Sequence, residues 1–176
     1  MSMPPKPVQP MQSAEILKKM ISSVPVAKNN ENTMKELPET MNVLFVDDDK
    51  ITRKLFCRTM KKILPGWVVQ EAASGEEALG LVDGTEKPFD LIFMDYYMGT
   101  DNKQLLGSEA VAELRKRGIN AKVCGMSAND VENMFDDAGA DEFSFKPLPF
   151  RPQPLTQELN RILSINDDWG VVALKQ

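Results

Sequence analysis

Short apolar runs alternate with stretches of helical periodicity between residues 41 and 163. A continuous apolar run of four to eight residues between turn signals is typical of a strand that is buried on both faces. The pattern therefore predicts five strands, beginning with the run Val43-Leu44-Phe45-Val46. Their expected positions are residues 43–46, 67–69, 89–94, 121–126 and 142–145.

The stretches between these runs carry apolar side chains every three or four residues, which predicts amphipathic helices. Turn signals such as Pro65-Gly66 and Asp83-Gly84 mark their ends. In the first helix we expect Ile51, Leu55, Phe56, Met60 and Ile63 to face inward. The expected helices are residues 50–64, 74–84, 107–117, 129–137 and 152–163.

Strands that alternate with helices in this way predict a parallel sheet covered on both faces, because each crossover must be right-handed. We expect an α/β, flavodoxin-like (βα)5 doubly wound sheet with strand order 2-1-3-4-5, in one domain at residues 41–163. Residues 1–40 are rich in proline and polar residues, which predicts a flexible, disordered or weakly helical N-terminal extension. Residues 164–176 are expected to form a C-terminal tail.

Composition narrows the range of possible functions. The net charge of -5 argues against nucleic-acid binding, which needs a basic surface. No apolar run approaches the roughly 20 residues that span a bilayer, and the N-terminus lacks the apolar core of a signal peptide. Cys57 and Cys124 are too few for a disulfide framework and predict a reducing, cytoplasmic setting. We expect neither membrane nor nucleic acid as a partner.

Histidine is absent from the chain. Its absence removes serine–histidine and cysteine–histidine nucleophiles and histidine metal ligands, and the chain cannot itself be a phosphohistidine donor. The glycine-rich dinucleotide fingerprint and the phosphate-binding loop ending in Gly-Lys-Ser/Thr are also missing. The available chemistry is therefore that of carboxylates, hydroxyls, lysine or a metal ion.

Charged and hydroxyl side chains follow four of the five predicted strands, at the sheet edge where open α/β folds place their sites. Clustered carboxylates repel one another unless a cation relieves them, and oxygen ligands without imidazole or thiolate favour Mg²⁺ or Mn²⁺. A lysine and a hydroxyl facing a metal-bound carboxylate can stabilise a transferring phosphoryl group. The residues are Asp47, Asp48 and Asp49 after the first strand, Asp95 after the third, Ser127 after the fourth and Lys146 after the fifth.

Five motifs that include these residues resemble the receiver domain of two-component response regulators, over residues 41–163. The resemblance implies a stand-alone phosphoacceptor module of a phosphorelay rather than an enzyme. Its partners would be a histidine kinase or histidine phosphotransfer protein and an unidentified output protein. The motifs are Val46-Asp47-Asp48-Asp49, Met94-Asp95-Tyr96-Tyr97-Met98, Met126-Ser127-Ala128-Asn129, Ala138-Gly139-Ala140 and Lys146-Pro147.

The same resemblance implies a role for each residue of the site. Asp95 would accept the phosphoryl group and ligate Mg²⁺ together with Asp48, while Asp47 would act mainly through water. The backbone carbonyl of Tyr97 would complete the protein ligands. Lys146 would pair with the phosphoryl oxygens. Ser127 would move toward the phosphoryl group, which would let Phe143, at the family's aromatic switch position, turn inward.

The chain departs from the family pattern beside the expected acceptor. Met98 is followed by Gly99 where the family usually has proline, and the segment before Gly107 is longer than usual by roughly four residues. Tyr97 occupies a position that modulates hydrolysis in the family. We therefore expect Tyr97 to shield the acyl phosphate from water.

Two other functions are compatible with parts of the pattern. Asp47-Asp48-Asp49 fits the Asp-x-Asp opening of haloacid-dehalogenase-type phosphatases, with Asp47 as nucleophile and Asp49 as general acid. That assignment leaves Asp95 without a role. A pseudo-receiver that binds partners without phosphorylation is the other alternative. In the receiver interpretation Asp49 is expected to be only the N-cap of the first helix.

Overall fold

The computed structural model describes residues 37–99 and 104–164. The predicted N-terminal extension and C-terminal tail lie almost wholly outside these ranges, as do residues 100–103 of the long loop. The elements are β1 (Met41–Val46), α2 (Lys50–Ile63), β2 (Trp67–Ala72), α3 (Gly75–Gly84), β3 (Leu91–Asp95), α4 (Gly107–Lys116), β4 (Lys122–Ser127), α5 (Glu132–Asp137), β5 (Glu142–Phe145) and α6 (Pro152–Ser164).

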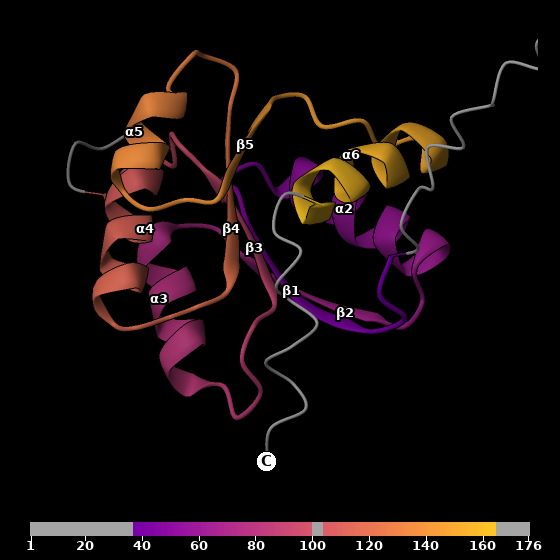
Figure 1. The fold of residues 1–176 in the computed structure, drawn as a ribbon, viewed down its shortest axis with the longest axis horizontal. Helices are drawn as coiled ribbons and strands as arrows, with labels where there is room; N and C mark the ends of the chain where they lie inside the picture. The colour runs from indigo at the N-terminus through magenta and orange to yellow at the C-terminus, as the bar shows by residue number, and fades with distance from the viewer. Residues whose placement is uncertain (1–36, 100–103, 165–176) are drawn as a thin grey trace, which may run out of the picture. The chain divides into compact units, whose positions relative to one another are not determined.

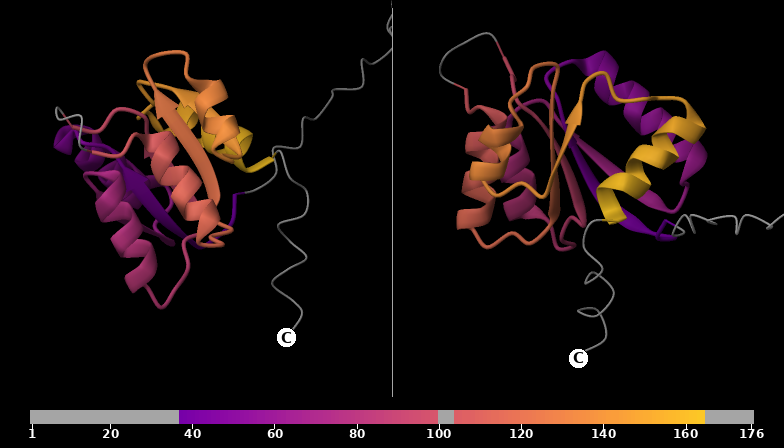
Figure 2. Two further views of the ribbon diagram at one scale, coloured as in Figure 1. Left: turned by 90° about the vertical axis from the view of Figure 1, so that its left-hand side faces the viewer. Right: turned by 45° about the horizontal axis from the view of Figure 1, so that its top comes forward.

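The five strands form one parallel sheet in the order β2-β1-β3-β4-β5, which confirms the predicted fold. Helices α3, α4 and α5 cover one face of the sheet, and α2 and α6 cover the other (Figures 1 and 2). The register pairs Val46 with Met94 and Asp95 with Met126. The carboxyl ends of β1, β3 and β4 therefore lie side by side at one edge.

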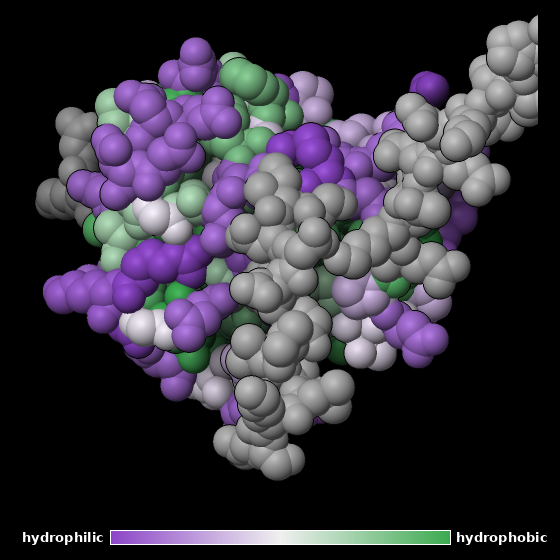
Figure 3. Space-filling view, viewed as in Figure 1, coloured by the Kyte–Doolittle hydropathy of each residue, from purple (hydrophilic) through white to green (hydrophobic). Residues whose placement is uncertain are grey.

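Two apolar clusters hold the helices to the sheet, one on each face. The cluster under α2 and α6 contains three stacked or edge-on rings, Phe45, Phe56 and Phe93, with centroids 4.0–5.8 Å apart. Hydrophilic side chains gather outside, for example over α5 at the upper left of Figure 3. β3 runs between the two clusters with all five residues buried, which explains its uninterrupted apolar sequence before Asp95.

The predicted inward face of α2 is partly wrong. Phe56 and Met60 are fully buried against the sheet, but Ile51 is 77% exposed and Leu55 is 42% exposed. Ile51 and Leu55 are one turn apart and lie on a second face, about 100° or more around the helix from Phe56. The sequence periodicity merged two neighbouring apolar stripes into one.

Strand and helix ends differ from the predictions by one to three residues. β2 continues to Ala72, and β3 and β4 include Asp95 and Ser127 as their last residues. α5 begins at Glu132 rather than at residue 129. The Ser127 hydroxyl accepts the backbone N–H of Asn129 at 3.1 Å, and this local turn occupies the start of the predicted helix.

Cys124 is buried, Cys57 is half-buried, and neither forms a disulfide. Burial raises the pKa of the Cys57 thiol to about 11 and that of Cys124 to about 12, so both are packing groups rather than reactive thiols. Within residues 37–99 and 104–164, every helix is too short or too polar to cross a bilayer.

Candidate functional site

The loop between β1 and α2 places its three carboxylates in different environments. Asp47 is fully buried, and its Oδ1 accepts the backbone N–H of Asp49 at 2.9 Å. Asp48 is exposed. Asp49 is the N-cap of α2, and its side chain accepts the N–H groups of Ile51 and Thr52 at 3.0 and 3.1 Å. The structure therefore confirms Asp49 as a helix cap.

Hydrogen bonds explain the different electrostatics of Asp49. The Thr52 hydroxyl donates to Asp49 at 2.6 Å, and this bond, together with the two backbone N–H groups, holds the pKa of Asp49 below its ordinary value. Both carboxylate oxygens of Asp49 are thus used in capping. Asp47 and Asp48 are the two carboxylates of the loop that face the neighbouring strand end.

A lysine joins the ends of three strands. Lys146 follows β5, and its Nζ lies 2.8 Å from Asp47 Oδ2 and 2.8 Å from Asp95 Oδ2. Asp95 Oδ1 accepts the backbone N–H of Tyr96 at 2.9 Å. The predicted residues of β1, β3 and β5 therefore meet at one point, because their strands are parallel and nearly adjacent.

The pKa of Asp95 is raised from 3.8 to about 6. Burial is the main cause, and the negative charge of Asp47 adds to it, while Lys146 and the N–H of Tyr96 act in the opposite direction. Burial alone would lower the pKa of Lys146, but its bonds to Asp47 and Asp95 raise it. One lysine therefore does not neutralise the carboxylates around it.

The carboxylates fit a hard divalent cation. Asp47, Asp48 and Asp95 each offer an oxygen, and these oxygens lie within 4.8 Å of one another. Asp47 Oδ2 is buried and has no hydrogen-bond partner among the described residues beyond its ion pair with Lys146. A cluster of carboxylate oxygens without nitrogen or sulfur ligands suits Mg²⁺ or Mn²⁺.

The residues after Asp95 contact the acidic loop. Gly99 donates its backbone N–H to Asp48 Oδ2 at 3.0 Å. Its φ of +97° is accessible to glycine but not to proline, and proline also lacks the N–H. The Gly99 departure therefore has a structural consequence. It joins the start of the long loop to one of the three clustered carboxylates.

Tyr97 is 55% exposed and packs edge-on against the buried ring of Tyr96, with centroids 4.7 Å apart. Its two neighbours in the chain are buried, so Tyr97 is the aromatic side chain that this strand end presents to solvent. The predicted roles of its backbone carbonyl and its ring remain predictions.

Ser127 lies on β4, which is next to β3, and Phe143 lies on β5, the edge strand beyond it. Ser127 is buried at the end of β4, one position beyond the residue paired with Asp95. Phe143 is also buried, and its ring lies between Phe135 and Phe145, at centroid distances of 6.0 and 5.1 Å. Phe143 therefore already points inward, while Phe145 is 58% exposed.

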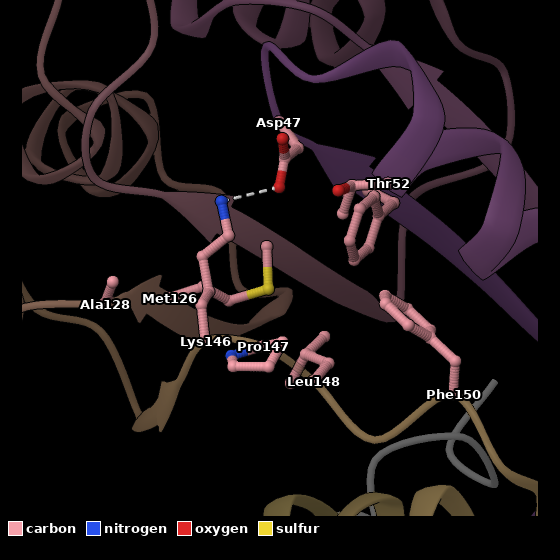
Figure 4. A pocket seen from close by; sticks show the side chains of 9 residues that line it. Asp47, Thr52, Met126, Ala128, Lys146, Pro147, Leu148 and Phe150 are labelled. Carbon is pink, nitrogen blue, oxygen red and sulfur yellow. Dashed lines mark ion pairs between the residues drawn. The ribbon is translucent and has the colours of Figure 1, made fainter.

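A pocket of about 180 Å³ opens beside the cluster (Figure 4). Lys146 extends toward Asp47 along one side of it, and Thr52 lies opposite. The rest of its lining is mainly apolar. It comprises Phe45, Met126, Ala128, Pro147, Leu148 and Phe150.

Sequence reasoning missed the importance of Gly107. A Cβ atom at this position would lie 2.0 Å from the backbone oxygen of Asp95, and the Gly107 N–H bonds the Tyr96 carbonyl at 2.8 Å. The first residue of α4 therefore packs directly against the backbone of the β3 end. A glycine that opens a helix without a side-chain cap was the available signal.

Comparisons with known proteins match this arrangement. Residues 43–160 match the family described as response regulator receiver domain. The two-component response regulator ORR41 of Oryza sativa subsp. japonica is 33% identical over 111 residues, which cover 61% of this chain and 84% of that protein.

Solved structures give the same match in three dimensions. The chemotaxis protein CheY4 of Vibrio cholerae superposes with a TM-score of 0.59 at 26% identity, over 70% of this chain and 99% of that chain. The response regulator TrrA of Thermotoga maritima, solved in complex with Mg²⁺-BeF, gives a TM-score of 0.55 at 27% identity, again over 70% and 99%.

Proposed function

The chain belongs to the response regulator receiver family of two-component signalling, and on that basis we propose that Asp95 is its phosphoryl acceptor. The observation that carries the proposal is the bridge of Lys146 between Asp95 and Asp47, with Asp48 completing a group of three carboxylates. This arrangement pairs a nucleophilic oxygen with a fixed cation at the same strand end.

The reaction is a transfer between two side chains. A carboxylate oxygen of Asp95 attacks phosphorus, the P–O bond of an acyl phosphate forms, and the P–N bond of a phosphohistidine breaks. The electron pair of that bond leaves with the imidazole. In the metal-free protein the pKa of Asp95 is raised to about 6, so its carboxylate form, the nucleophile, predominates above about pH 6.

The residues around Asp95 have distinct roles in this transfer. Lys146 holds its ammonium group beside the accepting carboxylate and stabilises the oxygens of the arriving phosphoryl group. Asp48, Asp95 and the Tyr97 carbonyl would ligate Mg²⁺ or Mn²⁺, and Asp47 would act mainly through water. A divalent cation held by these residues would supply positive charge that stabilises the phosphoryl oxygens.

The phosphohistidine is not part of this sequence, because the sequence has no histidine. A histidine kinase or a histidine phosphotransfer protein supplies the phosphohistidine. Phosphorylation then moves Ser127 toward the phosphoryl group. The predicted inward turn of Phe143 would favour the buried position that its ring has in this structure, and the surface formed by α5, β5 and α6 in that state would be the one that an output protein recognises.

The phosphatase alternative fits the geometry less well. It requires Asp49 as a free general acid, but both oxygens of Asp49 accept hydrogen bonds from the first turn of α2. It also leaves the lysine-bound carboxylate of Asp95 unused.

The test is phosphorylation by acetyl phosphate with Mg²⁺, followed by intact-mass measurement. The wild-type protein should gain one phosphoryl group, and Asp95→Asn should gain none. Asp137→Asn, which changes an exposed aspartate on α5, is the matched control and should behave as wild type. Turnover of acetyl phosphate that survives Asp95→Asn would support the phosphatase, and a wild-type protein that stays unmodified would support the pseudo-receiver.

A further inference from the structure

Arg53 on α2 contacts the backbone of the acidic loop. Its Nη1 donates to the carbonyl oxygen of Asp47 at 2.6 Å and to that of Asp48 at 3.0 Å. The side chain is only 13% exposed. One guanidinium nitrogen thus joins the peptide carbonyls of the two residues whose carboxylates help to form the acidic cluster.

Glu71 on β2 fixes the other side of this guanidinium. Its Oε2 lies 3.5 Å from Arg53 Nε, and its Oε1 lies 2.7 Å from Lys54 Nζ. The bond to Lys54 is the largest influence that holds the pKa of Glu71 below its ordinary value. Glu71 is therefore an anionic support that orients Arg53 from an adjacent strand.

A largely covered arginine beside a site for a metal cation is electrostatically unfavourable. The positive charge of Arg53 repels a divalent ion held by the side chains of the same loop, so charge alone predicts that Arg53 weakens metal binding. Its benefit must come from geometry. Two anchored carbonyls restrict the backbone that carries Asp47 and Asp48, and a restricted backbone loses less conformational freedom when its carboxylates converge on a metal ion.

We propose that Arg53 is a positioning residue that holds the Asp47–Asp48 backbone in the geometry needed to bind the divalent cation. This inference rests on the proposed function, because it assumes that the acidic cluster takes Mg²⁺. Arg53 contacts neither the ion nor the phosphoryl group. It acts through the peptide carbonyls of the loop.

The test is Mg²⁺ affinity, measured by isothermal titration calorimetry on the full chain without any phosphodonor. We expect Arg53→Ala to weaken binding by about tenfold, in line with other residues that orient metal ligands. The Mg²⁺ affinity of Arg53→Lys should lie between those of wild type and Arg53→Ala, because lysine keeps the positive charge but lacks the planar guanidinium group. An Arg53→Ala protein that binds Mg²⁺ as tightly as wild type, or more tightly, overturns the inference, and tighter binding would identify simple charge repulsion.

Lys54→Ala is the matched control. Lys54 also pairs with Glu71, but it is 64% exposed and none of its bonds reaches the acidic loop. Its removal should leave Mg²⁺ affinity within about twofold of wild type. Equal losses in Arg53→Ala and Lys54→Ala would assign the effect to their shared partner Glu71 rather than to the Arg53 contacts with the loop, and would overturn positioning.

The two proposals fail separately. If wild type binds no Mg²⁺, the metal-dependent function fails and takes the Arg53 role with it. If wild type binds Mg²⁺ and Arg53→Ala is unchanged, only the Arg53 role fails. Amide NMR spectra of each variant, recorded without metal, establish that the fold is intact. In those spectra Arg53→Ala should broaden or shift the Asp48 and Asp49 amides, whereas Lys54→Ala should leave them in place.

Discussion

Two charged clusters lie near the same strand, β5, and they are built on opposite principles. At its carboxyl end, Lys146 faces three clustered carboxylates and pairs with two of them. Along its length, Arg161 of α6 donates to Glu142, the Phe143 carbonyl, Ser144 and Glu158. The first cluster sets three carboxylates against one ammonium group. The second sets two carboxylates against one guanidinium group and has more hydrogen bonds, although Glu142 Oε1 has no hydrogen-bond partner among the described residues.

The pKa directions follow this difference. Burial raises the pKa of Asp95 to about 6, and its lysine partner does not reverse the shift. The Arg161 bond lowers the pKa of Glu158, and burial does not reverse that shift. A carboxylate with too few hydrogen-bond or ionic partners remains able to bind a cation or to accept a phosphoryl group. A carboxylate whose oxygens are all paired contributes to the stability of the fold instead.

The largest contrast should appear in metal binding. We expect Asp48→Asn to weaken Mg²⁺ affinity by about 100-fold, because a charged ligand is replaced by a neutral one. Its free energy of unfolding should stay the same or rise, since one member of a mutually repelling group is removed. Calorimetric titration and urea unfolding measure the two quantities, and Glu158→Gln should leave Mg²⁺ affinity unchanged. Similar Mg²⁺ losses in both variants would remove the distinction between the clusters.

The reverse experiment removes the cation of the second cluster. Arg161→Ala should lower the free energy of unfolding by about 2–3 kcal/mol, because the Glu142 carboxylate stays buried without its cationic partner. Urea unfolding monitored by circular dichroism provides the measurement. Mg²⁺ affinity should not change.

Arg117→Ala is the matched control for Arg161. Arg117 also pairs with two carboxylates, Glu113 and Asp83, but these pairs lie at the surface. Its loss should cost less than about 1 kcal/mol. Equal decreases in the free energy of unfolding for Arg161→Ala and Arg117→Ala would show that the burial of the carboxylate beside Arg161 does not add to stability.

The comparison also explains what the sequence could predict. The carboxylates that follow β1 and β3 stand out because acidic residues directly after a buried apolar run have no local explanation, and parallel topology brings them together. Asp49 was identifiable as a cap from its position before α2. Local pattern and one topological rule were sufficient for these residues.

Arg53 and Arg161 could not be found in this way. Each makes bonds to backbone carbonyls or side chains whose placement depends on how a helix rotates against the sheet. Periodicity did not determine that rotation for α2, where Ile51 and Leu55 were wrongly placed inside. From sequence alone, a charged residue on an amphipathic helix cannot be distinguished from one that faces solvent, because the orientation of the helix against the sheet is not known.

The contributions of the two clusters to the free energy of unfolding should change with pH in opposite directions. In metal-free protein the folded-state pKa of Asp95 is above its unfolded value of 3.8, so the folded state binds more protons between about pH 4 and 6 and stability falls as pH rises through that window. The difference should reach on the order of 2 kcal/mol and disappear in Asp95→Asn. Glu158 has a lowered pKa, so its contribution is present above its unfolded value of 4.5 and is lost as pH falls below it.

Urea unfolding in EDTA across this pH range distinguishes the two groups. Wild type should lose stability relative to Asp95→Asn as the pH is raised from about 4.5 to 7. Glu158→Gln should retain that loss, because Asp95 is still present. If the difference in free energy of unfolding between wild type and Asp95→Asn did not change with pH, the carboxylates of the site would be neutralised as fully as those around Arg161.

The smallest expected effect concerns the access of water to the acceptor site, because the two clusters also differ in solvent exposure. In the Arg161 cluster the Glu142 side chain is only 6% exposed, whereas the acceptor site lies beside Tyr97, which is 55% exposed. If the ring shields the acyl phosphate, Tyr97→Ala should lose its phosphoryl group about threefold faster, a change of roughly 0.7 kcal/mol in the barrier. Tyr97→Phe keeps the ring and its edge-on contact with Tyr96, so the decay rate of its phosphorylated form should match wild type.

Decay of the phosphorylated protein, followed by intact mass after the donor is removed, gives the rates. An unchanged rate in Tyr97→Ala would show that exposure at this side chain does not control hydrolysis, and equal acceleration in Tyr97→Phe would assign the effect to the hydroxyl instead of the ring.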